Sequence, residues 1–121
     1  MYGPFSKEAL MAKSITRTYS RHTREAMKLL GQLIRLGRIE RKLTAQDLAD
    51  RAGISRGLLQ RIEKGDLKCE IGVVFELATL VGVKLFDADA PTLASHISRT
   101  EDKLALLPKH VRKTKVVDDE F

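Results

Sequence analysis

The sequence has no tryptophan, and aromatic residues make up only 5% of its 121 positions. A hydrophobic core must therefore be built from Leu, Ile, Val and Ala, and 43% hydrophobic residues are enough for one compact domain with tails. Proline is also scarce, with three residues in the whole chain, which suits helices because proline interrupts them. We therefore expect a single, small, all-α domain.

Cysteine and long apolar runs are equally sparse. Cys69 is the only cysteine, so no disulfide can form within the chain, as is usual in a reducing compartment. No apolar stretch approaches the roughly 20 residues of a membrane-spanning helix, and the N-terminus lacks the apolar region of a secretory signal. The sequence predicts a cytoplasmic protein with no membrane segment. Because Met11 is an alternative start position, residues 1–10 are left out of the fold prediction.

Residues that bind metals or catalyse reactions are present but not grouped. His22, His96 and His110 are far apart, and Cys69 has no second cysteine at ligand spacing. The glycines follow no phosphate-loop pattern, and no serine stands in a nucleophile-elbow motif. We expect no enzyme activity, no metal, no cofactor and no small-molecule ligand.

Charge is unevenly spread along the chain. The net charge is +6, but residues 1–42 carry +7, whereas residues 69–107 and 116–121 each carry −3. A chain polarised in this way can turn a positive face toward phosphates. A solvated charged surface would give the same pattern, so charge alone favours nucleic acid only modestly.

The hydrophobic pattern predicts five helices and no strand. They are expected at about residues 23–41, 45–52, 56–64 and 71–81, with a fifth starting near Pro91. Thr44 and Ser55 are expected N-caps, and Gly53, Gly65 and Gly82 are expected to end helices. The residues expected to face inward are apolar and lie at helical spacing: Met27, Leu30, Ile34, Leu48, Ala49, Leu59, Ile62, Val74, Leu77, Ala78 and Val81.

The turn between the second and third predicted helices is informative. Gly53-Ile54-Ser55 is too short for the two helices to lie antiparallel, so they should cross steeply, as in a DNA-reading helix-turn-helix. The second helix of this pair then presents an outward polar face. Arginine pairs with guanine and glutamine with adenine, and glycine allows close approach of the backbone. The candidate base-reading residues are Arg56, Gly57, Gln60 and Arg61.

The stretch from Leu43 to Gly65, with Leu-Ala-x-x-Ala-Gly-Ile-Ser and Ile-Glu-Lys-Gly, resembles the Xre, or phage-repressor-like, helix-turn-helix family. The resemblance extends from Leu30 to Val83. It implies a five-helix repressor-like domain that binds a palindromic operator in double-stranded DNA as a homodimer. It also implies an ion pair between Arg38 and Glu63. The phosphate-binding residues expected by position are Thr44, Gln46, Ser55, Lys64 and Lys68.

Two positions depart from this family pattern. Many members have glutamine where this chain has Ala45, and Leu58 stands at a position that is often polar. Ala45 weakens the expected contribution of the first motif helix, while Leu58, on the second, is expected either to lie against a sugar or a thymine methyl group or to reduce binding. The two departures leave open an alternative, that the domain has lost DNA binding and acts as a protein-interaction adaptor.

The C-terminal part holds an apolar stripe of heptad type, whose members lie 4, 7 and 3 residues apart. The helix expected within residues 89–108 could pack on its own domain, form a dimer interface or bind another protein. The candidate contact residues are Leu93, Ile97, Leu104, Leu107 and Phe121. The expected layout is a flexible basic arm at 1–20, the helix-turn-helix domain at 21–88, the contact helix at 89–108 and a flexible tail at 109–121.

Together these features predict a sequence-specific transcriptional repressor. Residues 104–112 and the acidic end at 117–121 resemble extensions of regulators paired with HipA-type kinases. This resemblance implies a HipB-like antitoxin that regulates its own operon and sequesters the toxin kinase. An autonomous repressor of phage or mobile-element type, with no toxin partner, is the alternative.

Overall fold

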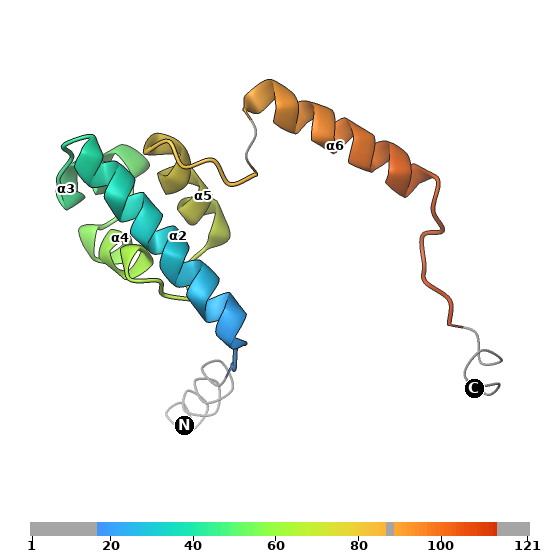
Figure 1. Cartoon of the computed structure of the whole chain (residues 1–121), viewed down its shortest axis with the longest axis horizontal. Coiled ribbons are helices and arrows are strands. Elements are labelled where there is room, and N and C mark those ends of the chain that lie inside the picture. Colours follow the sequence, from blue (N-terminus) through green and yellow to red (C-terminus); the bar gives the residue numbers. More distant parts are fainter. Residues whose placement is uncertain (1–16, 87–88, 114–121) are drawn as a thin grey trace, which may run out of the picture. The chain divides into compact units, whose positions relative to one another are not determined.

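The computed structural model describes residues 17–86 and 89–113, which form five helices and no strand. This confirms the predicted all-α, five-helix fold. The helices are α2 (Arg21–Glu40), α3 (Ala45–Ala52), α4 (Arg56–Glu63), α5 (Ile71–Leu80) and α6 (Ala90–Ala105) (Figure 1). Contacts divide the chain into two compact units, the first ending at Val83 and the second beginning at Lys84.

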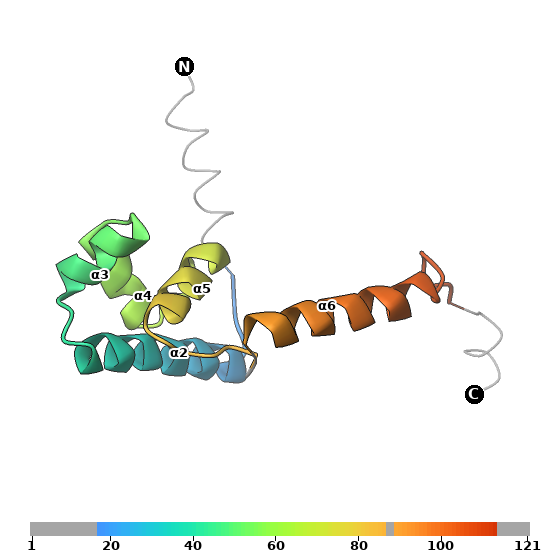
Figure 2. The same cartoon turned by 90° about the horizontal axis from the view of Figure 1, so that it is seen from above.

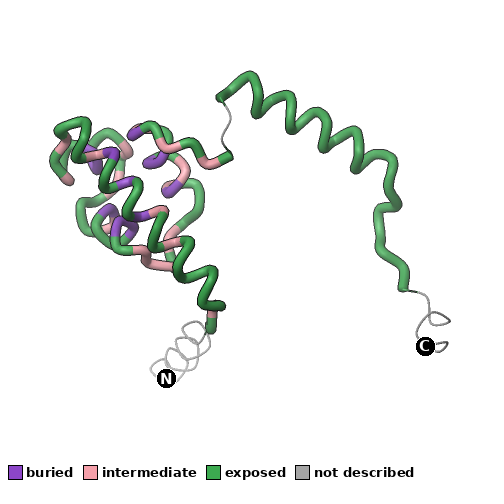
Figure 3. Tube along the Cα trace, viewed as in Figure 1, coloured by how far each residue is buried: buried purple, intermediate pink, exposed green. Residues whose placement is uncertain are grey.

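The core of the first unit lies between α2 and the three shorter helices. Helices α3, α4 and α5 all lie on the same side of α2 (Figure 2). The buried residues lie where these helices face one another (Figure 3). Most are those predicted from the sequence, although Met27 and Leu30 are only half-buried. The buried apolar residues are Ile34, Leu48, Ala49, Leu59, Ile62, Val74, Leu77, Ala78 and Val81.

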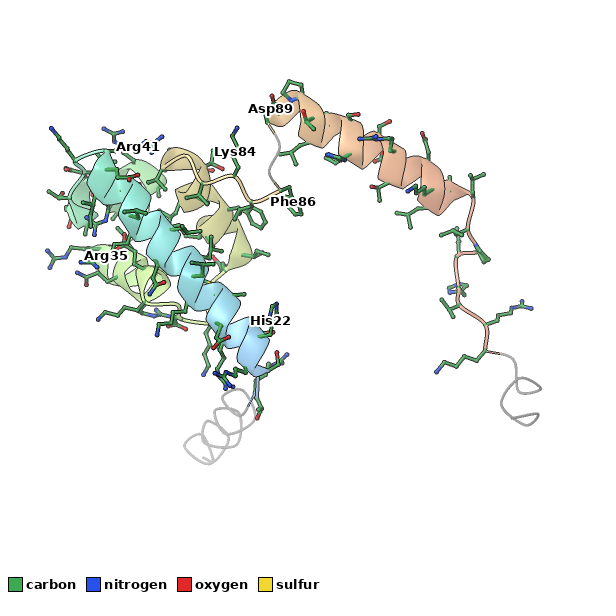
Figure 4. The ribbon with its side chains drawn as sticks, in the orientation of Figure 1. His22, Arg35, Arg41, Lys84, Phe86 and Asp89 are labelled. Atoms are coloured by element: carbon green, nitrogen blue, oxygen red, sulfur yellow. The ribbon has the colours of Figure 1, made fainter. Side chains whose placement is uncertain are left out.

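Two buried glycines on α2 explain how closely the helices pack. A Cβ built on Gly31 would lie 2.8 Å from the carbonyl oxygen of Glu63. A Cβ on Gly37 would lie 2.9 Å from the carbonyl oxygen of Val81. Any side chain at these positions would therefore push α2 away from α4 and from the end of α5. Arg41, labelled in Figure 4, strengthens the second contact because its Nη1 donates to the Val81 carbonyl.

Side-chain caps fix where α3 and α4 begin. The Thr44 hydroxyl accepts a hydrogen bond from the Asp47 amide at 3.0 Å, and the Asp47 carboxylate accepts one from the Thr44 amide at 3.0 Å. This is a complete capping box at the predicted position. The Ser55 hydroxyl likewise accepts from the Leu58 amide at 3.1 Å. Both motif helices therefore begin at the residues the sequence predicts.

Helix α2 begins two residues earlier than predicted. The expected start was near Thr23, but the Ser20 hydroxyl accepts a hydrogen bond from the Thr23 amide at 3.2 Å and is the actual N-cap. Both residues are good capping types, and the cap at Ser20 adds a further half turn of helix.

The first four helices end in left-handed residues, one of them unexpected. Gly53, Gly65 and Gly82 have φ values of 71°, 87° and 80°, as their predicted terminating role requires. After α2, however, the left-handed residue is Lys42, with a φ of 59°. A non-glycine residue adopts this conformation at a cost of about 1–2 kcal/mol, so nothing in the local sequence predicts it at Lys42.

Helix α6 belongs to the second unit. The Asp89 carboxylate accepts a hydrogen bond from the Thr92 amide at 3.0 Å, and Pro91 lies in the first turn, as predicted. The helix ends at Ala105, shorter than the expected 89–108, because Pro108 disfavours helical backbone at the residue before it. None of the residues of α6 is buried (Figure 3). Within the described residues, no helix is both long and apolar enough to cross a membrane.

Candidate nucleic-acid interface

The turn between α3 and α4 is closed by two backbone hydrogen bonds. The Gly53 amide donates to the Asp50 carbonyl at 3.2 Å, and the Ile54 amide donates to the Ala49 carbonyl at 3.0 Å. Ile54 is half-buried beneath the turn, whereas Gly53 is exposed. The turn therefore holds α3 and α4 in one fixed relation, which a helix-turn-helix requires.

Helix α4 has one buried side and one exposed polar side. Leu59 and Ile62 are fully buried, whereas the four predicted base-reading residues are all exposed on the same helix. A Cβ added at Gly57 would meet no atom within 4 Å, so the backbone is openly accessible there. Arginine and glutamine carry the donors that pair with guanine and adenine in the major groove. The exposed residues are Arg56, Gly57, Gln60, Arg61 and, at the helix end, Lys64.

An ion pair fixes the end of α4 to α2. Arg38 Nε lies 2.7 Å from Glu63 Oε2, and Arg38 Nη2 lies 3.1 Å from Glu63 Oε1. The third donor, Nη1, binds the Leu43 carbonyl at 3.0 Å. The side chains are only 12% and 6% exposed, and the hydrogen bond with Glu63 raises the pKa of Arg38. This is the pair that the family resemblance implies, and it holds the exposed face of α4 in place.

The predicted phosphate-binding residues are all exposed, but some already have partners. Gln46 Nε2 donates to Asp50 Oδ1 at 2.8 Å, and the Thr44 amide is used by the capping box. The Asp47 carboxylate also adds negative charge at the start of α3, and the hydrogen bonds from Thr44 lower its pKa. Phosphate contact at this end of α3 thus competes with internal hydrogen bonds. The Ser55 hydroxyl likewise already accepts from the Leu58 amide, whereas the exposed side chains of Lys64 and Lys68 form no hydrogen bond to any residue that the structure describes.

Sequence reasoning missed an ion pair at the end of α4. Arg61 Nε lies 2.8 Å from Asp66 Oδ2, and this hydrogen bond raises the pKa of the Arg61 guanidinium. The available signal was an aspartate directly after the terminating Gly65. The bond between Gln46 and Asp50 was also missed, although its i,i+4 spacing on a helix is a recognised signal.

Exposed apolar residues form stripes on α2 and on α6. The predicted contact residues Leu93, Ile97 and Leu104 on α6, and Leu107 just after it, are exposed, from 36% for Leu93 to 63% for Leu104. Phe121 lies outside the described residues. Helix α2 carries a second exposed stripe that sequence reasoning missed, although its i, i+4, i+7 spacing was visible. This stripe comprises Leu29, Leu33 and Leu36.

No group of three or more His, Cys, Asp or Glu side chains suited to a metal ion occurs in the part of the chain that the structure describes.

Two short helices joined by the turn Gly53-Ile54-Ser55, with an exposed basic and polar second helix anchored to a third helix, define a DNA-binding helix-turn-helix protein. Comparison with protein families gives the same result, because a model described as "helix-turn-helix domain" matches residues 29–93, more than half of the chain. The chain belongs to this helix-turn-helix domain family. No curated protein and no solved structure matches it.

Proposed function

We propose that this chain is a transcriptional repressor that reads base edges in the major groove through α4. One observation carries the proposal: Arg56, Gln60 and Arg61 surround the accessible backbone of Gly57 on the exposed side of α4. The proposed layout has a DNA-binding domain at residues 21–88 and a contact helix at residues 89–108, between an arm at 1–20 and a tail at 109–121.

Base-reading and phosphate-binding roles predict different behaviour in single variants. Arg56→Ala and Arg61→Ala should each weaken binding to the preferred duplex by about 1–3 kcal/mol and relax its sequence preference. Lys68→Ala should weaken binding to all duplexes alike and lower the slope of log affinity against log salt by about one. Fluorescence anisotropy with a preferred and a scrambled duplex measures both effects.

Arg99→Ala on α6 is the matched control, because it removes the same charge from a residue outside the motif. If the two α4 variants and Lys68→Ala weaken both duplexes to the same extent, the proposed division of roles is wrong. Absence of any DNA binding would instead favour the protein-interaction adaptor.

We also propose that the repressor binds a palindromic operator as a homodimer through the stripe on α6. One recognition helix reads few base pairs, and two-fold pairing places a second helix about 34 Å away along the DNA. The exposed Leu93, Ile97, Leu104 and Leu107 supply an apolar surface for this contact.

Sedimentation velocity tests the dimer. The unmodified chain should sediment as a dimer and Ile97→Asp as a monomer, whereas Ser95→Asp, off the stripe on the same helix, should remain dimeric. A monomeric unmodified chain would contradict the proposal.

A finer proposal is that the repressor is the antitoxin of a HipBA-like module. It is supported by the resemblance of residues 104–112 and 117–121 to extensions of regulators paired with HipA-type kinases. Co-purification with a HipA-type kinase should succeed with the full chain and fail with a chain ending at residue 108. DNA binding without any complex would contradict the antitoxin role and favour an autonomous repressor.

A further inference from the structure

The turn after α4 brings two side chains of opposite charge together. The Gly65 amide donates to the Ile62 carbonyl at 2.9 Å, and the Asp66 amide donates to the Arg61 carbonyl at 3.0 Å. With Gly65 in the left-handed conformation, these bonds form a Schellman motif. This motif places the side chain after the glycine close to the third residue from the helix end. Here those two positions hold Asp66 and Arg61.

The same motif ends α3 and α5 but carries different residues there. At the end of α3 the equivalent pair is Ile54 and Ala49, and at the end of α5 it is Val83 and Ala78. Helix α2 ends in the same pattern, with Lys42 in place of the glycine, and there the pair is Leu43 and Arg38, again without two opposite charges. Apolar residues are the usual choice, because the motif favours a hydrophobic contact at these positions. The charged pair after α4 is therefore not needed to form the turn.

The Asp66 carboxylate is held on both sides. Its Oδ2 accepts from Arg61 Nε at 2.8 Å, while its Oδ1 accepts from the Lys68 amide at 2.8 Å. These two hydrogen bonds, first that of Lys68 and then that of Arg61, lower the pKa of Asp66. The carboxylate thus remains charged at neutral pH and is fixed to the backbone.

The turn after α4, at Gly65, packs closely against α2. A Cβ added at Gly65 would lie 2.9 Å from the Cα of Lys28, so the backbone of the turn touches the backbone of α2. An aspartate on such a turn has little freedom to move. It provides a rigid support for any side chain that it binds.

The contact leaves most of the arginine donors free. A guanidinium carries five N–H groups, and Asp66 uses the one on Nε. No hydrogen bond joins the two Nη groups to any residue that the structure describes. The Arg61 side chain is 55% exposed, so these groups can pair with the two acceptors of a guanine edge.

We propose that Asp66 is a positioning residue for sequence discrimination, holding Arg61 in a fixed orientation before DNA binds. This inference rests on the proposed function, because it assumes that Arg61 reads a base. A carboxylate with no positioning role would only repel phosphates and weaken binding to all DNA alike. The positioning role therefore raises the ratio of specific to nonspecific affinity, whereas simple repulsion leaves this ratio unchanged.

The test measures this ratio for Asp66→Asn, with a preferred and a scrambled duplex at fixed salt. Asparagine keeps an acceptor for the Lys68 amide but loses the charge that holds Arg61. The ratio should fall by about tenfold, within the range for one base-reading arginine, while binding to the scrambled duplex is retained or strengthened. Glu76→Gln, an exposed residue on α5, changes the net charge equally and should leave the ratio unchanged.

A double-variant cycle makes the test specific. In an Arg61→Ala background, Asp66→Asn should have no further effect on the ratio, because the residue it positions is absent. An unchanged ratio in the single variant, or an equal fall in both backgrounds, would overturn the positioning role. If the unmodified chain prefers no duplex over another, the proposed function itself fails, so the two failures are distinguishable.

Discussion

Arg38 on α2 and Glu63 on α4 form a two-point ion pair, with N–O distances of 2.7 and 3.1 Å, that joins the first helix of the domain to the proposed recognition helix. Both side chains are nearly buried, so each neutralises a charge that would otherwise be desolvated without a partner.

Removing one partner of the Arg38–Glu63 ion pair should lower the stability of the fold. We expect Glu63→Ala to lower the free energy of unfolding by about 3–5 kcal/mol, because the Arg38 guanidinium is left buried and unpaired. Urea unfolding measures the loss. Glu25→Ala is the matched control, because the Arg21–Glu25 pair is largely exposed, and it should cost less than about 1 kcal/mol. Equal losses in the two variants would contradict a structural role for the buried pair.

Close packing of α2 on α4 should make Gly31 intolerant of any side chain. Gly31→Ala would place a methyl group against the carbonyls of Ile62 and Glu63, so stability should fall by about 1–3 kcal/mol or more. Gly72→Ala is the control, because its added methyl group meets no atom within 4 Å and should stabilise α5 by about 0.5–1 kcal/mol. Thermal unfolding that shows the same sign for both would refute the close approach.

Gly57 should separate stability from DNA binding. Alanine there adds a methyl group in open space, so Gly57→Ala should stabilise α4 by about 0.5–1 kcal/mol. The same methyl group would hold the helix backbone away from the base edges and weaken binding to the preferred duplex. Gly72→Ala should give the stability gain without loss of affinity. A Gly57→Ala variant that binds DNA as well as the unmodified chain would show that α4 does not approach bases at this point.

The free energy of unfolding should fall at acid pH because of two aspartates, Asp47 near the start of α3 and Asp66 in the turn after α4. Hydrogen bonds, chiefly from the amides of Thr44 and Lys68, lower the pKa values of Asp47 and Asp66 below the usual 3.8. The folded state therefore binds fewer protons than the unfolded state in this range. Their contribution is complete above about pH 4 and is lost as the pH falls through the lower folded-state values. Unfolding at several pH values should show this decline, and Asp47→Asn should reduce it. An identical pH dependence in the variant would contradict the assignment.

Local sequence signals predict the positions of α3 and α4, but they do not predict how α2 ends or how closely it packs on α4. Helices α3 and α4 lie where predicted because capping residues, glycines and apolar spacing agree there. Lys42 shows the limit, since it adopts a left-handed conformation that local propensity disfavours, with its amide and that of Leu43 donating back to carbonyls of α2. The role of Gly31 was equally invisible, because it depends on how close a distant helix lies.

In the candidate site, likewise, the exposure of residues could be predicted from the sequence, but one of the contacts between them was missed. The exposure of Arg56 and Arg61 follows from helical periodicity, which places them opposite Leu59 and Ile62. The ion pair of Arg61 with Asp66 depends on the geometry of a turn, which brings together residues five apart in the sequence. A search for opposite charges at the two close positions of each predicted helix end would have found it.

The most direct test of the account is a comparison of affinities for selected and scrambled DNA. Duplexes bound by the full chain are first selected from a random pool, and the dissociation constant is then measured for the best duplex and for its scrambled form at the same salt concentration. The account predicts that the selected duplex binds at least about 10³-fold more tightly, as is typical of sequence-specific proteins. Equal affinity for the two duplexes would contradict base reading by α4.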